Sequence, residues 1–206
     1  MPRKLCDGCS RPVSVCICEH LVSVVAPIEV VILQHQSEQK QALATVPLIE
    51  RCLSPVSVLV GEDFSDHEII KEILKSPNQV RVVFPADSAQ TWKIGDSISA
   101  NDRQINKLIF IDGTWRKAKR IWHSNHWLAQ LPAVILTEMA PTAYKIRSSS
   151  VEGGVSTLEA VVGALNYLTA TSDFDQLQKP FNAMIDLQIQ KMGSEVFAAH
   201  YEQSDG

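Results

Sequence analysis

Short runs of β-branched and apolar residues alternate with stretches of helical periodicity along most of this chain, and this alternation constrains the fold most. The runs are expected strands, and their mostly continuous apolar character is typical of strands in a parallel sheet. They are Glu29–Leu33, Val56–Val60, Val80–Phe84, Lys107–Ile111 and Ala133–Leu136. The pattern predicts an α/β fold with a mainly parallel sheet and flanking helices.

The segments between these runs show helical spacing of their apolar residues. Helices are expected over Ser37–Leu53, Asp66–Leu74, Trp115–His123, Ser156–Leu168 and roughly Leu177–Gln203. Ligands of such sheets bind at the carboxyl ends of the strands. The loops after Leu33, Phe84, Ile111 and Leu136 are therefore the expected ligand-binding edge. The first three of these loops carry notable polar residues: His35 and Glu38, Asp87 and Ser88, and Asp112 and Thr114 respectively.

The first 20 residues differ in character, because they carry Cys, Gly and Pro and few large apolar side chains. Four of the five cysteines lie here, at Cys6, Cys9, Cys16 and Cys18. Four thiolates satisfy tetrahedral zinc, and such a cluster in a reducing compartment indicates metal ligands rather than disulfides. We expect a small zinc-binding knuckle over residues 1–22 and a catalytic domain over 23–206. His20 is an alternative ligand, and free or redox-active thiols are the alternative interpretation. The fifth cysteine, Cys52, is expected to be a small buried residue.

The apolar strand 107–111 ends directly in Asp112-Gly113-Thr114-Trp115. A carboxylate there meets solvent or substrate, the glycine permits close approach, and the tryptophan offers a broad aromatic face. The simpler alternative is a helix cap beside a core tryptophan. The position of the whole group at a strand end favours a catalytic site.

The next segment is basic and aromatic in a chain whose net charge is −4. From Arg103 to His126 there are six Lys or Arg residues against one acid. Basic side chains neutralise phosphates and aromatic rings stack on unpaired bases, so this segment is an expected RNA surface. Its candidate contacts are Arg116, Lys117, Lys119 and Arg120, with Arg147 as a further anion clamp. A solvated helix face over buried tryptophans is the alternative.

Further along, Ser156-Thr157-Leu158-Glu159 opens an apolar helix and fits a capping box. The free N–H groups of a helix start also attract anions. A structural cap and a ligand contact are therefore both expected here.

Taken in order, these motifs resemble the DTW-domain proteins, specifically the bacterial tRNA-uridine aminocarboxypropyltransferases. The resemblance rests on the cysteine knuckle with Arg11-Pro12, Leu33-Gln34-His35-x2-Glu38, Thr45, Phe84-Pro85-x-Asp87-Ser88-Ala89, Asp112-Gly113-Thr114-Trp115 and Ser156-Thr157-Leu158-Glu159-Ala160. Gln36 stands where many relatives have proline, and the 37–51 segment is sparse in arginine.

The resemblance implies a SPOUT-like fold with a trefoil knot near the cofactor site. The implied activity is transfer of the 3-amino-3-carboxypropyl group of S-adenosylmethionine to N3 of a uridine in tRNA, with methylthioadenosine as by-product. Asp112, Thr114 and Trp115 would be catalytic. S-adenosylmethionine would be held by Leu33, Pro85, Leu136, Tyr144, Ser156, Thr157 and Glu159.

Two other functions remain open at this level. One is an S-adenosylmethionine-dependent RNA methyltransferase, and the other is a zinc-knuckle RNA-binding factor without catalysis. No secretory signal or membrane span is visible in the sequence, which predicts a cytoplasmic protein. No feature calls for an obligatory protein partner.

Overall fold

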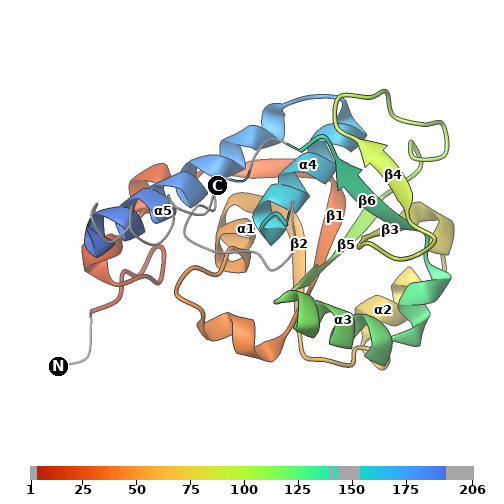
Figure 1. Ribbon diagram of the computed structural model, residues 1–206, viewed down its shortest axis with the longest axis horizontal. Helices are drawn as coiled ribbons and strands as arrows, with labels where there is room; N and C mark the ends of the chain where they lie inside the picture. The colour runs from red at the N-terminus through yellow and green to blue at the C-terminus, as the bar shows by residue number, and fades with distance from the viewer. Residues whose placement is uncertain (1–3, 140–141, 143–153, 194–206) are drawn as a thin grey trace, which may run out of the picture.

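The computed structural model describes residues 4–139, 142 and 154–193 of the 206-residue chain. At its centre, described strands form one six-stranded sheet in the order β2-β1-β5-β3-β6-β4, with every neighbouring pair parallel (Figure 1). The strands are β1 (Val24–Gln34), β2 (Leu53–Val60), β3 (Val80–Val83), β4 (Gln90–Lys93), β5 (Lys107–Asp112) and β6 (Ala133–Thr137). The predicted parallel α/β sheet is confirmed.

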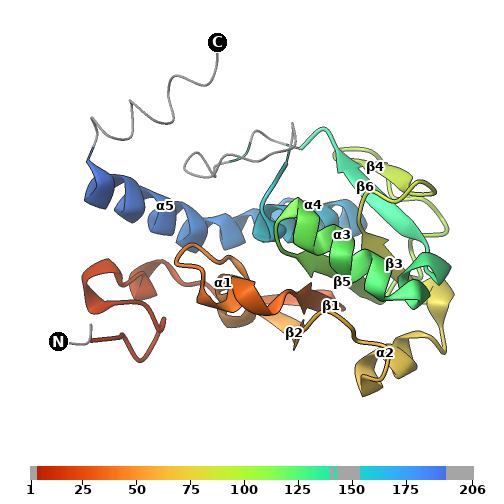
Figure 2. The same cartoon turned by 60° about the horizontal axis from the view of Figure 1, so that its bottom comes forward.

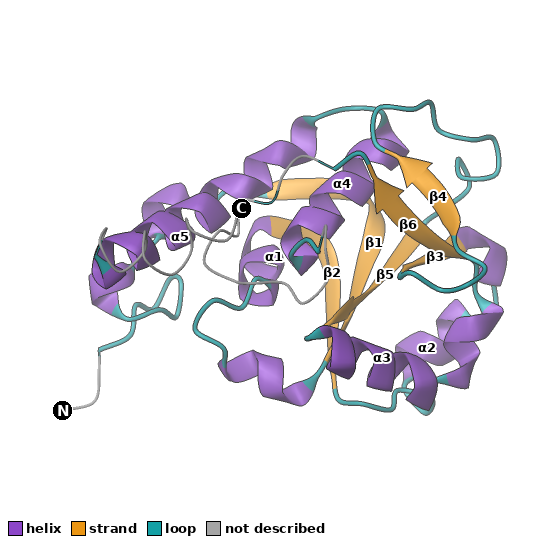
Figure 3. Cartoon of the chain, in the orientation of Figure 1, coloured by secondary structure: helices purple, strands orange, loops and turns teal. Residues whose placement is uncertain are grey.

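Helices cover both faces of the sheet (Figure 3). One face packs against α1 (Val46–Cys52), α4 (Thr157–Thr169) and α5 (Gln178–Met192), and the other against α2 (Glu68–Ile73) and α3 (Trp115–Ser124). Short 3-10 helices span Val13–Val15, Cys18–His20, Gln36–Lys40, Pro77–Gln79, His126–Gln130 and Asp173–Leu177.

Successive residues of the central strands serve opposite faces, as strand geometry requires. In β1, Val30 and Ile32 belong to the core under α4, whereas Val31 and Leu33 belong to the core under α2 and α3. Both faces are buried, which explains why these strands are continuously apolar in the sequence.

The predicted helix over Ser37–Leu53 is wrong in extent. A 3-10 helix covers Gln36–Lys40, and α1 begins only at Val46. Proline lacks an N–H and is accepted only in the first turn of a helix, so Pro47 fixes where α1 starts. Strand β2 follows immediately at Leu53.

The C-terminal helix is shorter than predicted, because α5 ends at Met192. Gly193 follows with φ 87°, a conformation that glycine adopts without strain. Residues 194–206, which include the rest of the predicted helix, lie outside the described part of the chain.

Strand β4 was not predicted. Only Trp92 of its four residues is buried, so the segment lacks an apolar run. Trp92 stacks on Tyr167 of α4, with ring centroids 4.6 Å apart, and its Nε1 donates to Asp102 Oδ2 at 3.2 Å. One anchored aromatic side chain therefore holds this edge strand in place.

The cysteine-rich N-terminal segment packs against the main core instead of standing apart from it. Ile17 is fully buried and Cys9 is 5% exposed, and both belong to the core that includes α4 and α5. Figure 2 shows the knuckle, in red, beside the far end of α5. The division at residue 22 remains a prediction, as do the SPOUT relationship and the knot.

None of the helices in the described ranges is long and apolar enough to span a membrane.

Candidate active site

Three neighbouring strands end side by side at the carboxyl edge of the sheet. Gln34 ends β1 and pairs in register with Asp112, which ends β5. Phe84 follows the end of β3, on the other side of β5. From β1 the chain first adds β2 on one side and then crosses to β3 on the other. This reversal is the switch point at which α/β sheets bind ligands.

Asp112 is held by donors from two other elements. Thr157 Oγ1, in the first turn of α4, donates to Oδ1 at 2.6 Å, and Gln34 Nε2 donates to Oδ2 at 3.0 Å. The backbone N–H of His35 donates to the Asp112 carbonyl at 3.0 Å. The carboxylate thus links β1, β5 and α4 at the site.

The turn after Asp112 depends on a residue without a side chain. A Cβ on Gly113 would lie 3.1 Å from Lys117 Cβ and 3.6 Å from His35 Cβ. A larger residue would therefore push α3 away from the sheet edge. Thr114 occupies the N-cap position of α3, but within the described chain its side chain makes no capping hydrogen bond. Thr114 thus stands at the cap position that the simpler alternative predicts, and it is exposed at the surface.

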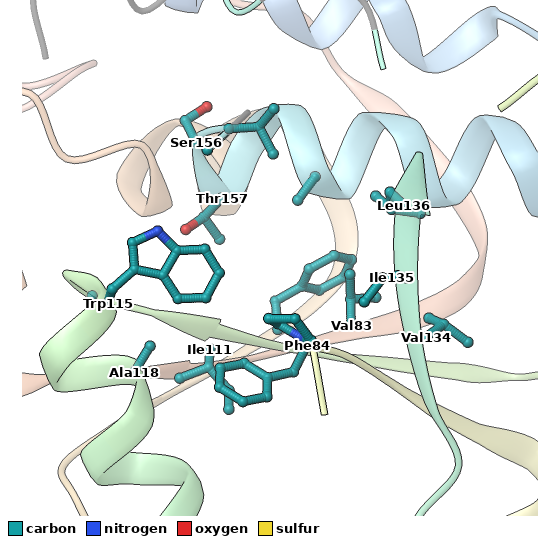
Figure 4. Close-up of a pocket in the computed structure, with 16 residues that line it drawn as sticks. Val83, Phe84, Ile111, Trp115, Ala118, Val134, Ile135, Leu136, Ser156 and Thr157 are labelled. Atoms are coloured by element: carbon teal, nitrogen blue, oxygen red, sulfur yellow. The ribbon is translucent and has the colours of Figure 1, made fainter. Parts of the chain in front are cut away.

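A cleft of about 240 Å³ opens beside this turn (Figure 4). It lies between the ends of β3, β5 and β6 and the start of α4, and most of its lining is apolar. The lining residues are Val83, Phe84, Pro85, Phe110, Ile111, Gly113, Trp115, Ala118, Val134, Ile135, Leu136, Gly154, Val155, Ser156, Thr157 and Ala160. A flat, largely apolar ligand with a polar end suits such a cleft.

Aromatic rings form one wall of the cleft. Phe84 stacks on Trp122 of α3 with centroids 4.7 Å apart and planes 14° apart. Trp115 is tilted against Phe84 at 6.4 Å and lies in the cleft close to Thr157 in Figure 4. Both tryptophans are partly buried against the core under α2 and α3, and Trp115 also lines the cleft.

The start of α4 carries the predicted capping box. Ser156 Oγ accepts from the Glu159 N–H at 3.2 Å, and Glu159 Oε2 accepts from the Ser156 N–H at 2.7 Å. Thr142 Oγ1 also donates to Glu159, at 2.7 Å. The structural role predicted for Ser156 and Glu159 is confirmed, and the buried Glu159 carboxylate links the start of α4 to Thr142.

Charged pairs surround the site on its α3 side. The buried His35 contacts Glu62 through Nε2 at 2.8 Å, and Arg120 reaches the same Glu62 oxygen at 3.3 Å. The hydrogen bond from His35, helped by Arg120, lowers the pKa of Glu62. Lys117 pairs with the buried Glu38 at 2.6 Å. These pairs fasten the 3-10 helix after β1 to α3.

The residues predicted to hold S-adenosylmethionine fall into three groups. Pro85, Leu136, Ser156 and Thr157 line the cleft, and the buried Glu159 supports them by accepting a hydrogen bond from the Ser156 N–H. Leu33 is fully buried under α2 and α3, where it supports the sheet rather than the cleft. Tyr144 lies outside the described residues.

The predicted RNA contacts on α3 divide into paired and exposed side chains. Lys117 and Arg120 are engaged by Glu38 and Glu62. Arg116 and Lys119 are exposed, and no ion pair is seen for either in the part of the chain described. Arg147 lies outside the described residues. Figure 1 shows α3, the helix that carries the exposed Arg116 and Lys119, beside the carboxyl end of β5.

The four N-terminal cysteines converge as predicted. Their Sγ atoms all lie within 4.8 Å of one another, with Cys6 3.5 Å from both Cys16 and Cys18, and Cys9 3.8 Å from Cys16. Tetrahedral zinc with Zn–S bonds of about 2.3 Å places its sulfurs about 3.8 Å apart, so the donor set fits a structural zinc ion. The backbone N–H of Cys9, together with the neighbouring thiols, lowers the pKa of Cys6 to about 6.

Arginine side chains attach this cysteine cluster to the rest of the protein. Arg51 of α1 donates to the Gly8 carbonyl at 2.6 Å and to Ser10 Oγ at 2.7 Å, and Arg11 donates to the Ala42 carbonyl at 3.3 Å. These hydrogen bonds therefore connect the knuckle to α1 and to the segment that precedes α1. Cys52, 2% exposed, is the buried residue that the sequence predicts.

Sequence reasoning did not single out Gln34 and Glu62 as site residues. Gln34 belongs to a recognised motif, but its amide at the end of an apolar run carries no chemical signal until β1 and β5 are known to be neighbours in this register. Glu62 lies in the loop after β2 and meets His35 only through the fold.

Comparison with known proteins decides the family. A model of the DTW domain matches residues 3–189. The chain belongs to the DTW-domain family. Relatives from fly, mouse and macaque bear the name tRNA-uridine aminocarboxypropyltransferase 2. The one from Drosophila melanogaster is 32% identical over 91% of this chain and 76% of its own length, and the one from Mus musculus is 30% identical over 91% and 64%. A tRNA-uridine aminocarboxypropyltransferase A from Arabidopsis thaliana is 28% identical over 58% of this chain and 50% of its own.

The chain thus spans somewhat less than two thirds of the mouse relative and about three quarters of the fly relative. These relatives are eukaryotic, so membership of a bacterial subgroup stays a prediction. No solved structure matches this DTW-domain protein.

Proposed function

We propose that this DTW-domain protein is a tRNA-uridine aminocarboxypropyltransferase that uses S-adenosylmethionine as donor and forms 3-(3-amino-3-carboxypropyl)uridine. The observation that carries the proposal is the position of Asp112–Trp115 beside the cleft at the switch point of the sheet. It is supported by relatives of that name over 91% of the chain. We place its action in the cytoplasm, where its tRNA substrate is found.

The cleft fits the donor molecule by its chemistry. Its apolar lining and the ring of Trp115 suit an adenine base, and the first turn of α4 offers N–H groups to a carboxylate. The carboxylate of Asp112, linked to the cleft through Thr157, suits a nearby cation. Among the residues predicted from the sequence, Pro85, Leu136, Ser156 and Thr157 would contact the donor and Glu159 would support them. Leu33 would act only by supporting the sheet beneath the site, and Tyr144 remains a proposed contact.

Bound S-adenosylmethionine supplies a sulfonium whose three carbons are all electrophilic, so orientation decides which group is transferred. Trp115 would hold the base of the donor or of the target, and exposed Thr114 would contact the target nucleotide at the rim. Asp112 would stabilise positive charge and take up the proton that uridine N3 loses as it attacks. A zinc ion held by Cys6, Cys9, Cys16 and Cys18 would stabilise the knuckle without entering the chemistry, since all four positions are protein ligands.

The tRNA would approach over α3. Arg116 and Lys119 would neutralise phosphates directly, whereas Lys117 and Arg120 would first have to leave their carboxylate partners. Arg147 is a further proposed contact.

Incubation of the purified protein with S-adenosylmethionine and an unmodified tRNA transcript tests the proposal. Nucleoside mass spectrometry should find a uridine heavier by about 101 Da and an equal amount of methylthioadenosine, because only attack at the one carbon gives both products. A gain of about 14 Da would instead identify a methyltransferase, since that is the mass of a transferred methyl group at another sulfonium carbon. Unmodified RNA that still binds the protein would favour a binding factor without catalysis.

A further inference from the structure

Thr157 stands between the cleft and Asp112. Thr157 lines the cleft, whereas Asp112 is not among the lining residues. The Thr157 hydroxyl donates to Asp112 Oδ1 at 2.6 Å, a distance typical of the strong hydrogen bond between a hydroxyl and a charged oxygen. Figure 4 shows this hydroxyl directed towards the side of the cleft where Trp115 lies. A ligand in the cleft therefore reaches the carboxylate by way of Thr157.

A hydroxyl can accept one hydrogen bond while it donates another. Because the Thr157 proton is directed at Asp112, the oxygen lone pairs of Thr157 remain to accept from an N–H group. Trp115 offers a flat surface next to it, on which a base can stack. A base stacked there can direct an edge N–H at the Thr157 oxygen.

Gln34 fixes the rotation of the same carboxylate. Its side chain is 3% exposed, and its Nε2 donates to Oδ2 at 3.0 Å from the neighbouring strand. The amide nitrogen is only a donor, so it cannot receive a proton from this carboxylate. It holds Oδ1 towards Thr157, which makes Oδ1 the acceptor on the substrate side.

We propose that Thr157 is a catalytic residue that passes the N3 proton of the target uridine to Asp112, with Gln34 as the positioning residue of the carboxylate. This inference rests on the proposed function. The Thr157 oxygen takes the N3 proton while its own proton moves to Asp112 Oδ1. The N3–carbon bond forms as the carbon–sulfur bond breaks, and that electron pair goes to sulfur. Asp112 ends as a neutral acid and then releases its proton to water.

Two variants of Thr157 separate this role from a purely structural tie between α4 and β5. Thr157→Val keeps the shape of the side chain but removes the hydroxyl, and Thr157→Ser keeps the hydroxyl. Thr169→Val is the matched control, because Thr169 lies at the other end of α4 and its hydroxyl, among the described residues, bonds locally to the Leu165 carbonyl and to Thr171. Turnover, donor affinity by calorimetry and melting temperature are measured for each.

For Thr157→Val we expect kcat to fall about 10²- to 10⁴-fold, the usual contribution of a positioned proton acceptor. Thr157→Val loses one hydrogen bond, so the melting temperature should fall by only about 2–4 °C for each kcal/mol lost, and donor affinity should fall far less than kcat. Thr157→Ser should restore most of kcat. Gln34→Met should move the acidic limb of the pH–rate profile to higher pH, because the carboxylate loses a donor that favours its charged form.

The outcomes are distinguishable. If the wild-type protein forms no aminocarboxypropyluridine, the proposed function fails and the relay fails with it. If the wild type is active and Thr157→Val turns over at the wild-type rate, the relay alone is overturned. A Thr157→Ser variant that binds the donor but is as slow as Thr157→Val would also overturn it, because the hydroxyl would then not carry the proton.

Discussion

Replacing Asp112 by asparagine or by leucine should separate its chemical role from its role in holding the site together. Asparagine has the shape of aspartate, and its Oδ1 can still accept from Thr157. The Gln34 amide can rotate so that its oxygen accepts from the new Nδ2. Leucine offers no acceptor to either partner. Because Gln34 is 3% exposed and Thr157 is half-buried, water cannot fully replace the lost acceptor.

The magnitudes follow from these contacts. Asp112→Leu leaves the buried Gln34 donor without its acceptor, which costs about 1–3 kcal/mol. For a chain of this size each kcal/mol lowers Tm by about 2–4 °C, so a fall of roughly 2–12 °C is expected. Asp112→Asn should keep Tm within about 2–4 °C, equivalent to a change below about 1 kcal/mol. Both variants should lose about 10²-fold or more in kcat, because neither side chain accepts a proton.

Thermal melting and single-turnover modification of tRNA measure the two effects independently. An Asp112→Asn variant that turns over normally would refute the proton-accepting role. An Asp112→Leu variant that melts like the wild type would refute the view that the carboxylate ties β1, β5 and α4 together.

Three further predictions concern parts of the protein away from Asp112. Cys9→Ser, like treatment with a strong chelator, should remove bound zinc in metal analysis and lower Tm, by about 2–4 °C for each kcal/mol lost; a wild-type protein without zinc, or a Tm unmoved by the chelator, would contradict this. Burial raises the pKa of Glu29, but its hydrogen bonds to a lysine and a serine outweigh this and leave the pKa below its ordinary value. Its stabilising contribution, up to about 1 kcal/mol, is therefore present above the unfolded pKa and lost as pH falls through the folded one, so the Tm difference of Glu29→Gln should vanish in acid and not at neutral pH. Reversing the charges of Arg116 and Lys119 together should weaken tRNA binding and reduce the salt slope by about 2, whereas Lys191→Glu on α5 should not, and an unchanged slope would move the RNA to another surface.

The sequence predicts those parts of the fold that local pattern controls. Buried parallel strands such as β5 appear as apolar runs because both of their faces are covered, and the capping box at Ser156 follows from local spacing alone. Pattern failed where one residue decides. Trp92 is the one buried side chain of β4, and Pro47 stands in the first turn of α1, where it fixes the start of the helix.

The sequence predicts individual residues of the candidate site at the ends of strands, but not the contacts between them. Asp112 and Ser156 each stand out in the sequence, but the contact between the end of β5 and the first turn of α4 depends on long-range packing. The same holds for Gln34, which becomes a partner of Asp112 through the register of β1 against β5. Leu33, only one residue before Gln34, points to the opposite face of the sheet, because neighbouring strand residues alternate.

S-adenosylmethionine labelled either in its methyl group or in its aminocarboxypropyl group tests the central claim most directly. Each labelled donor is incubated with the protein and an unmodified tRNA transcript, and the label in uridine is counted. We predict that the aminocarboxypropyl label enters the RNA and the methyl label leaves in methylthioadenosine, since the bound orientation selects one carbon of the sulfonium. Methyl label in the RNA, or no label from either donor in a tRNA that the protein binds, would contradict the account.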